Sequence, residues 1–143
     1  MGDLVRFPGA GRLVAVGQQA QREWELVHHD RPKPMNEYRR LHHYARAAYD
    51  KQWLEAFWVA AKRAAVPRLS YVGFVVQQLV RPGTPLPDPL AEAPTVKAAV
   101  DGIVLAKVIP KDTVDHVAWY HMQPAVVSKD GRDHLVITVV EQP

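Results

Sequence analysis

The fold is decided by residues 37–65, which read EYRRLHHYARAAYDKQWLEAFWVAAKRAA. This stretch contains neither proline nor glycine, and most of its residues favour helix. The pattern therefore predicts one long helix or two abutting helices. Two neighbouring apolar rows follow helical spacing: Trp53, Phe57 and Ala60, then Leu54, Trp58 and Ala61. These rows predict a helix face that packs against a sheet.

Strands are expected on both sides of this helical region. Residues 23–29 (EWELVHH) are rich in strand formers, and the breaker run DRPKPMN follows them. Residues 68–80 (RLSYVGFVVQQLV) are β-branched and aromatic, which predicts a central strand. Residues 94–107 begin with a proline that suits the first turn of a helix and carry apolar residues at helical spacing. They predict a second, amphipathic helix.

The last part of the chain is expected to form a pair of strands. Two apolar segments flank Asp130 and Gly131, a dipeptide typical of a tight turn between antiparallel strands. The order of elements predicts an α/β (α+β) fold: a mixed sheet of about four strands with two main helices, closing in an antiparallel hairpin. We expect a single domain over residues 23–143, preceded by an irregular N-terminal leader at residues 1–22, where glycines are scattered without a sustained period.

Composition narrows the setting in which the protein works. The chain has no cysteine, which excludes disulfides and thiolate-bound zinc and fits a reducing cytoplasm. The first residues lack the pattern of a signal peptide, and no window is apolar enough to cross a bilayer. The 18 basic and 15 acidic residues give a net charge of +3, which permits an anionic partner.

A group of charged residues surrounds the second predicted helix. Asp88 lies in the loop before the helix, Lys97 and Asp101 share one helix face, and Asp112 lies in the loop after it. If the chain folds back after the helix, the three acids gather near Lys97. Hard divalent cations bind clustered carboxylate oxygens, and such ions activate water for phosphodiester hydrolysis. The alternative is an exposed ion pair between Lys97 and Asp101.

A second group is basic and lies on the first helical region. Arg39, either His42 or His43, and Arg46 fall on successive turns of a helix, with Lys33 and Arg40 close by, and we take His43 as the histidine of this stripe. Such a stripe is typical of a surface that follows phosphates, although a solvated helix face carries the same pattern. We predict that these five residues bind DNA.

The ordered combination resembles the RusA family of Holliday junction resolvases, in particular its phage and prophage branch. The resemblance rests on RPKPMNEYRRLHHYARAAYDKQWLEAF, a following strand, and PDP…APTVKAAVDGIVLAKVIPKDT, and it spans roughly residues 24–140. It implies a small homodimer that binds four-way DNA junctions and cuts them with magnesium. It also implies metal-binding and catalytic roles for Asp88, Asp101 and Asp112, and a catalytic role for Lys97.

The chain departs from the family pattern at three positions. Leu90 stands where a second loop aspartate is expected, Ala91 where an asparagine is expected, and Lys111 where the final acidic pair would begin. Glu92 follows two positions after Leu90 and is a candidate replacement ligand, although a carboxylate there also suits the start of a helix.

Two functions follow from this resemblance, and a third, weaker alternative is a protein-interaction module that retains only the fold. The first is a magnesium-dependent structure-selective endodeoxyribonuclease, with manganese as the alternative ion, that resolves Holliday junctions in DNA recombination and repair. The second is a catalytically lapsed relative that binds branched DNA without cleaving it. Both imply a cytoplasmic, homodimeric protein of a bacterial cell, encoded by the host or by a phage or prophage.

Overall fold

The computed structural model describes residues 4–7, 11–16 and 19–143, with side chains described from residue 21 onward. In chain order, the elements are β1 (Leu4–Phe7), β2 (Gly11–Val16), β3 (Gln19–His28), α1 (Met35–Arg40), α2 (His43–Arg63), β4 (Val72–Val80), the 3-10 helix η1 (Pro89–Glu92), α3 (Ala93–Leu105), β5 (Val117–Met122), β6 (Val126–Val127) and β7 (His134–Glu141). The predicted helical region is two helices, because the chain leaves the helical conformation at Leu41 and His42 and α2 starts anew at His43.

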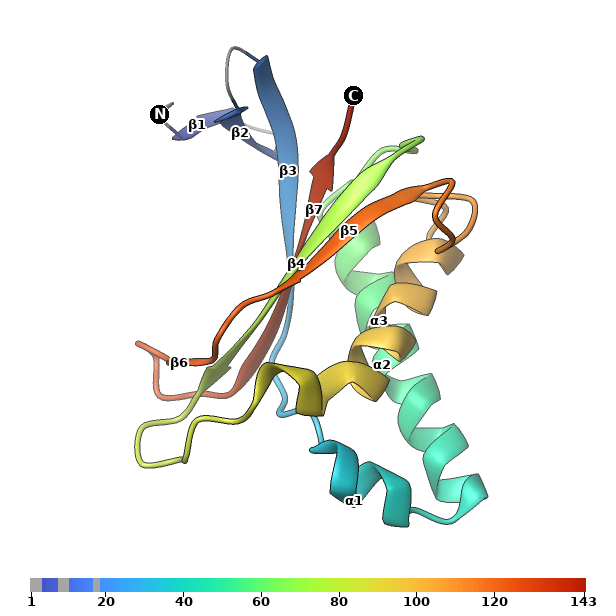
Figure 1. Ribbon diagram of the computed structural model, residues 1–143, viewed down its shortest axis with the longest axis vertical. Helices are drawn as coiled ribbons and strands as arrows, with labels where there is room; N and C mark the ends of the chain where they lie inside the picture. Colours follow the sequence, from blue (N-terminus) through green and yellow to red (C-terminus); the bar gives the residue numbers. More distant parts are fainter. Residues whose placement is uncertain (1–3, 8–10, 17–18) are drawn as a thin grey trace.

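A mixed sheet carries the fold, and the helices lie on one face of it (Figure 1). Its strand order in the described residues is β1-β2-β3-β7-β4-β5, and β6 also pairs with β4. Strand β4 is central, as predicted: it pairs antiparallel with β7 on one edge and parallel with β5 and β6 on the other. The predicted α+β class, with its mixed sheet and two main helices, is confirmed.

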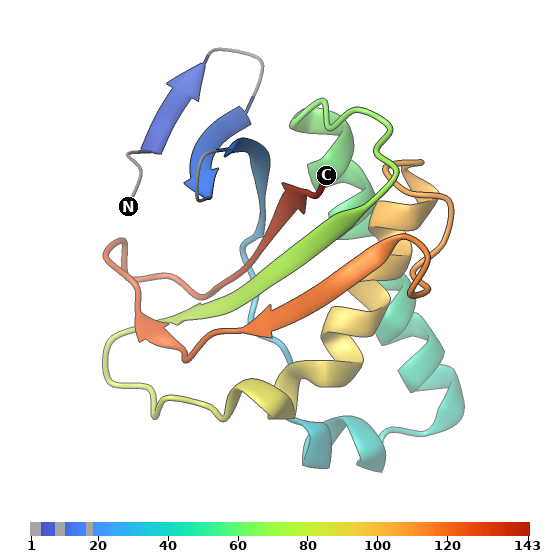
Figure 2. The same cartoon turned by 45° about the horizontal axis from the view of Figure 1, so that its top comes forward.

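The predicted terminal hairpin is wrong. Gly131 has a positive φ of 75°, and the Asp130 carboxylate accepts a hydrogen bond from the Arg132 N–H at 3.0 Å, so the chain bends at this dipeptide. The strands that it joins do not pair with each other, because β4 lies between them (Figure 2). A turn dipeptide predicts a local reversal of the chain, but it does not say which strand fills the neighbouring place in the sheet.

The N-terminal part also differs from the expected irregular leader. In its described residues, β1 pairs with β2, and β2 pairs with β3 from Arg12 opposite Glu23 to Val16 opposite Gln19. Residues 1–3, 8–10 and 17–18 lie outside the described residues. The short strands β1 and β2 extend the sheet beyond β3, whose own pairing with β7 begins at Glu23.

The hydrophobic core fills the space between the helices and the facing side of the sheet. Alternate residues of β4 and β7 point into it, and α2 contributes a single stripe at intervals of four residues: Tyr49, Trp53, Phe57 and Ala61. Trp58 is 39% exposed and Leu54 is half-buried, so only Ala61 of the second apolar row predicted for this helix belongs to the core. The helix buries one narrow stripe because only that side meets the sheet and α3.

The two main helices touch through their backbones. A Cβ atom added at Gly102 would lie 2.1 Å from the carbonyl oxygen of Leu54. The two helices are therefore closer at this point than any residue other than glycine would allow. One helical turn earlier on each helix, the two surfaces enclose a cavity that borders the charged residues described next.

Candidate functional site

Lys97 joins two of the predicted acids. Its ammonium group donates hydrogen bonds to Asp101 at 2.9 Å and to Asp112 at 2.5 Å. The hydrogen bond to Asp101, followed by that to Asp112, raises the pKa of Lys97 above its ordinary value, so this side chain stays charged. The predicted ion pair between Lys97 and Asp101 is therefore present, and Asp112 completes a three-residue cluster, which we call the Lys97 cluster.

The loop after α3 brings Asp112 back to the helix. Lys107 adopts a positive φ of 66° just after the helix ends, and the Leu69 N–H donates a hydrogen bond to the Val108 carbonyl at 2.6 Å. Val108 and Ile109 are buried in the core, which anchors the returning chain. The expected fold-back along the helix face is thus explained by a left-handed turn followed by two buried apolar residues.

Asp88 and Glu92 do not complete a metal site with this pair. The Asp88 carboxylate caps η1 by accepting a hydrogen bond from the Leu90 N–H at 2.9 Å. Glu92 is 1% exposed, and within residues 21–143 its carboxylate oxygens make no hydrogen bond of regular geometry, although the Gln78 side chain lies close to them. Burial raises the pKa of Glu92 to about 7, against a smaller lowering by the amide of Gln78.

The charges of the Lys97 cluster do not suit magnesium as they are arranged. Magnesium needs carboxylate oxygens that face a common point together with water. Here the Lys97 ammonium group takes the position between the two carboxylates. Within residues 21–143, where side chains are described, no group of three or more His, Asp or Glu side chains is arranged to hold a metal ion.

A cavity of about 420 Å³ lies beside the cluster, between α1, α2 and α3. Its polar lining comes from Tyr38, Asp50, Lys51, Lys97 and Asp101. The Tyr38 hydroxyl donates to the Asp50 carboxylate, with oxygen-to-oxygen distances of 2.9 and 3.0 Å. Sequence reasoning missed Tyr38 and Asp50, because the break between α1 and α2 brings them together and no helical spacing connects them.

The predicted DNA-binding residues separate into two groups. Arg39, Arg40 and His43 are exposed where α1 turns into α2. Arg46 instead supports this turn: its guanidinium donates to the carbonyls of Arg39 and Leu41, at 3.1 and 3.3 Å. It also lies over the Tyr38 ring, with 5.3 Å between the guanidinium carbon and the ring centroid.

Lys33 belongs with Arg46 as a residue that is engaged within the protein. Its N–H donates to the Tyr49 hydroxyl at 2.8 Å, and its ammonium nitrogen lies 5.9 Å from the centroid of the Tyr49 ring. We call the exposed region of residues 39, 40, 42, 43 and 44 the α1–α2 corner.

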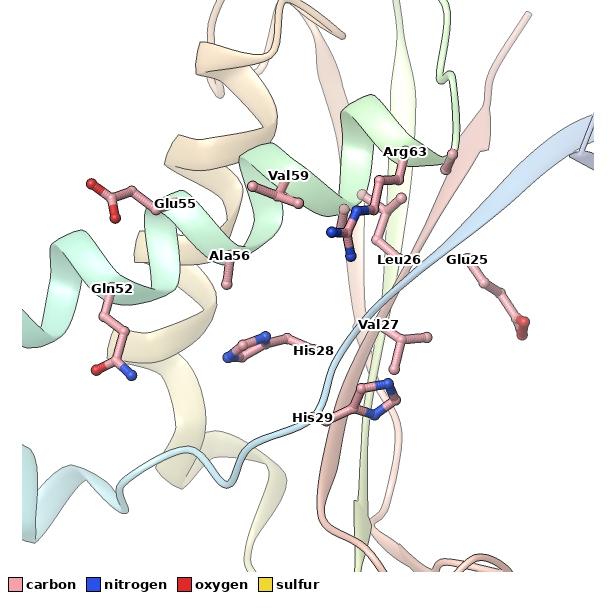
Figure 3. A pocket seen from close by; sticks show the side chains of 12 residues that line it. Glu25, Leu26, Val27, His28, His29, Gln52, Glu55, Ala56, Val59 and Arg63 are labelled. Carbon is pink, nitrogen blue, oxygen red and sulfur yellow. The ribbon is translucent and has the colours of Figure 1, made fainter.

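A larger pocket, of about 650 Å³, lies between β3 and α2 (Figure 3). His28 and His29 line one side of it and residues of α2, including Gln52 and Glu55, line the other. His29 Nδ1 also lies 2.5 Å from His134 Nδ1 of β7. The other ring nitrogen of His134 donates to Asp130, and this bond is the largest cause that lowers the pKa of Asp130 to about 2. No spacing in the sequence connects these histidines, because His29 and His134 are 105 positions apart.

Comparisons with known proteins leave the family open. No family model matches the chain, and no curated protein matches it. In the described part of the chain, no helix is long and apolar enough to cross a membrane.

Proposed function

We propose that this chain binds branched DNA through the α1–α2 corner and that it belongs to the catalytically lapsed type rather than the cleaving type. The observation that carries the DNA-binding proposal is the corner itself. Arg39, Arg40 and His43 are exposed together, and Arg46 fixes the turn that presents them. Exposed basic residues gathered on one turn attract phosphates, because each contact releases counterions from DNA.

The Lys97 cluster supports the lapsed type. Hydrolysis of a phosphodiester with magnesium needs carboxylates that are open to the ion. Asp101 and Asp112 are instead neutralised in part by Lys97, while Asp88 caps η1 and Glu92 is buried. Leu90 and Lys111 stand where the RusA-like pattern has acids, and these substitutions also support the lapsed type.

The second candidate is the magnesium-dependent Holliday junction endonuclease. The specific observation that favours it is the convergence of Asp101, Asp112 and Lys97 beside a cavity that Asp50 also lines. Either function predicts a homodimer, because a two-fold symmetric four-way junction suits a two-fold symmetric protein. Either function also places the protein in the cytoplasm of a bacterial cell.

Binding is tested by fluorescence anisotropy with a four-way junction and a linear duplex of the same sequence over a series of salt concentrations. We expect tighter binding to the junction and a steep loss of affinity with salt. Arg39→Ala should reduce the slope of log K against log salt by about one. Arg63→Ala removes the same charge from the far end of α2, a helix about 30 Å long, and should leave the slope unchanged. Equal slopes for all three proteins would contradict the corner as the DNA contact.

Cleavage is tested on the same junction with magnesium or manganese. We expect binding without nicking, and Asp112→Asn should bind as tightly as the wild type. If the wild type nicks the junction and Asp112→Asn does not, the endonuclease candidate replaces the lapsed one.

A further inference from the structure

Three aromatic rings lie close together in solvent at the α1–α2 corner, tilted against one another by 34° to 41°. The His42 and His43 ring centroids lie 4.1 Å apart, and those of His43 and Tyr44 also lie 4.1 Å apart. The His42 and Tyr44 rings are 5.4 Å apart, so the three rings form one cluster. All three residues are exposed, and Tyr44 is 75% exposed. These rings therefore face water rather than the core, and Tyr44 leaves most of its surface to solvent.

The surroundings of this ring cluster are basic. Arg39 and Arg40 precede it on α1, and both are exposed. The first turn of α2, which carries the rings, contains no acidic residue. A ligand that matches this surface has a flat apolar face next to a negative charge. An unpaired nucleotide has both, because its base offers a π face and its phosphate carries the charge.

From this geometry we infer that the ring cluster, His42, His43 and Tyr44, is a stacking platform for an unpaired DNA base, with Arg39 and Arg40 on the adjoining phosphates. The inference rests on the proposed DNA binding and names the feature of branched DNA that is recognised. Bases inside a duplex are already stacked on both faces. A base that is unpaired at a branch, fork or strand end has a free face, and the platform therefore selects DNA that contains one.

Arg46 makes the platform rigid before DNA arrives. Its hydrogen bonds to the carbonyls of Arg39 and Leu41 hold the end of α1 against the start of α2. The His42 ring nitrogen accepts a weak hydrogen bond, 3.4 Å long, from the Tyr44 N–H. A platform that is ordered in advance loses less conformational entropy when a base stacks on it.

The test compares a fully paired linear duplex with the same duplex carrying an unpaired tail that contains 2-aminopurine, whose fluorescence falls when the base stacks. We expect the wild type to bind the tailed DNA more tightly and to quench the probe. Tyr44→Ala should weaken binding of the tailed DNA about 5- to 150-fold, abolish the quenching, and leave binding of the paired duplex unchanged. Because tyrosine is uncharged, the salt slope should also stay the same.

Two variants serve as controls. Tyr44→Phe keeps the ring and should behave as the wild type. Leu86→Ala removes an exposed apolar side chain from the loop after β4 and should change nothing. If Tyr44→Ala binds and quenches like the wild type, or weakens both DNAs equally, the stacking inference is overturned while the proposed DNA binding stands. If the wild type binds neither DNA, both are overturned.

Discussion

At the scale of single residues, Lys97 determines whether the carboxylates of Asp101 and Asp112 are open to an external cation. A lysine that donates to two carboxylates lowers the repulsion between them, and it also takes the place in which a cation would sit. Its side chain is 63% exposed, so the cluster owes little of its effect to burial, and ion pairs this exposed contribute about 1 kcal/mol or less to stability. The role of Lys97 is therefore electrostatic: it controls whether the two acids are open to an external ion.

Replacing Lys97 should open the acids. We expect Lys97→Met to bind manganese about tenfold more tightly than the wild type, because two carboxylates then face each other without a cation. Isothermal titration calorimetry measures this affinity, and the free energy of unfolding should change by no more than about 1 kcal/mol.

Lys51→Met is the matched control, since Lys51 lines the same cavity but pairs with Glu55 at 3.8 Å. Similar gains in manganese affinity for Lys97→Met and Lys51→Met would mean that net charge, and not the Lys97 cluster, controls manganese binding.

At the scale of elements, the contact between α2 and α3 depends on Gly102. A methyl group there would lie 2.1 Å from a backbone oxygen of Leu54, which cannot move without moving the helix. Gly102→Ala should therefore lower the free energy of unfolding by about 3 kcal/mol, at the upper end of the usual cost of overpacking. Urea denaturation measures this loss.

Gly73→Ala provides the comparison for this prediction. A methyl group at Gly73 would meet the Trp119 ring at 2.2 Å, but Trp119 is a partly exposed side chain that can swing outward. Its cost should be smaller, and the tryptophan emission should shift to longer wavelength as the indole enters water. A larger loss for Gly73→Ala than for Gly102→Ala would contradict this account of the helix contact.

The same scale shows which features could be predicted from the sequence. Periodicity and turn residues predicted α2, α3 and the central strand β4, because those signals are local. The pairing of strands could not be predicted from such local signals, because the order β7-β4-β5 depends on which buried strand fills the centre of the sheet. For the candidate site, helical spacing predicted the contact between Lys97 and Asp101, whereas the contact between Tyr38 and Asp50 depends on the break between α1 and α2.

At the scale of the whole molecule, ionisable groups with opposite pKa shifts set the range of pH in which the fold is most stable. The hydrogen bond from Arg22 lowers the pKa of Glu141, so this ion pair between β3 and β7 stabilises the fold above the ordinary pKa of glutamate and is lost as the pH falls. Glu92 acts in the opposite sense. Its pKa is raised to about 7 by burial, so its contribution is fully present below its ordinary pKa and is lost as the pH rises toward 7. We expect maximal stability in the mildly acidic range.

Glu92→Gln should remove the loss of folding stability that occurs as the pH rises toward 7. The shift from 4.5 to about 7 corresponds to roughly 3 kcal/mol, because burial disfavours the ionised carboxylate by more than the nearby Gln78 side chain favours it. Relative to the variant, the wild type should therefore lose roughly 3 kcal/mol of unfolding free energy between about pH 4 and pH 8, as measured by urea denaturation at several pH values. Glu55→Gln is the control, since Glu55 is exposed on α2 and should give a curve parallel to that of the wild type. A curve for Glu92→Gln that is parallel to the wild type as well would show that Glu92 stays ionised in the folded protein, and the core at the start of α3 would then have to accommodate a charge.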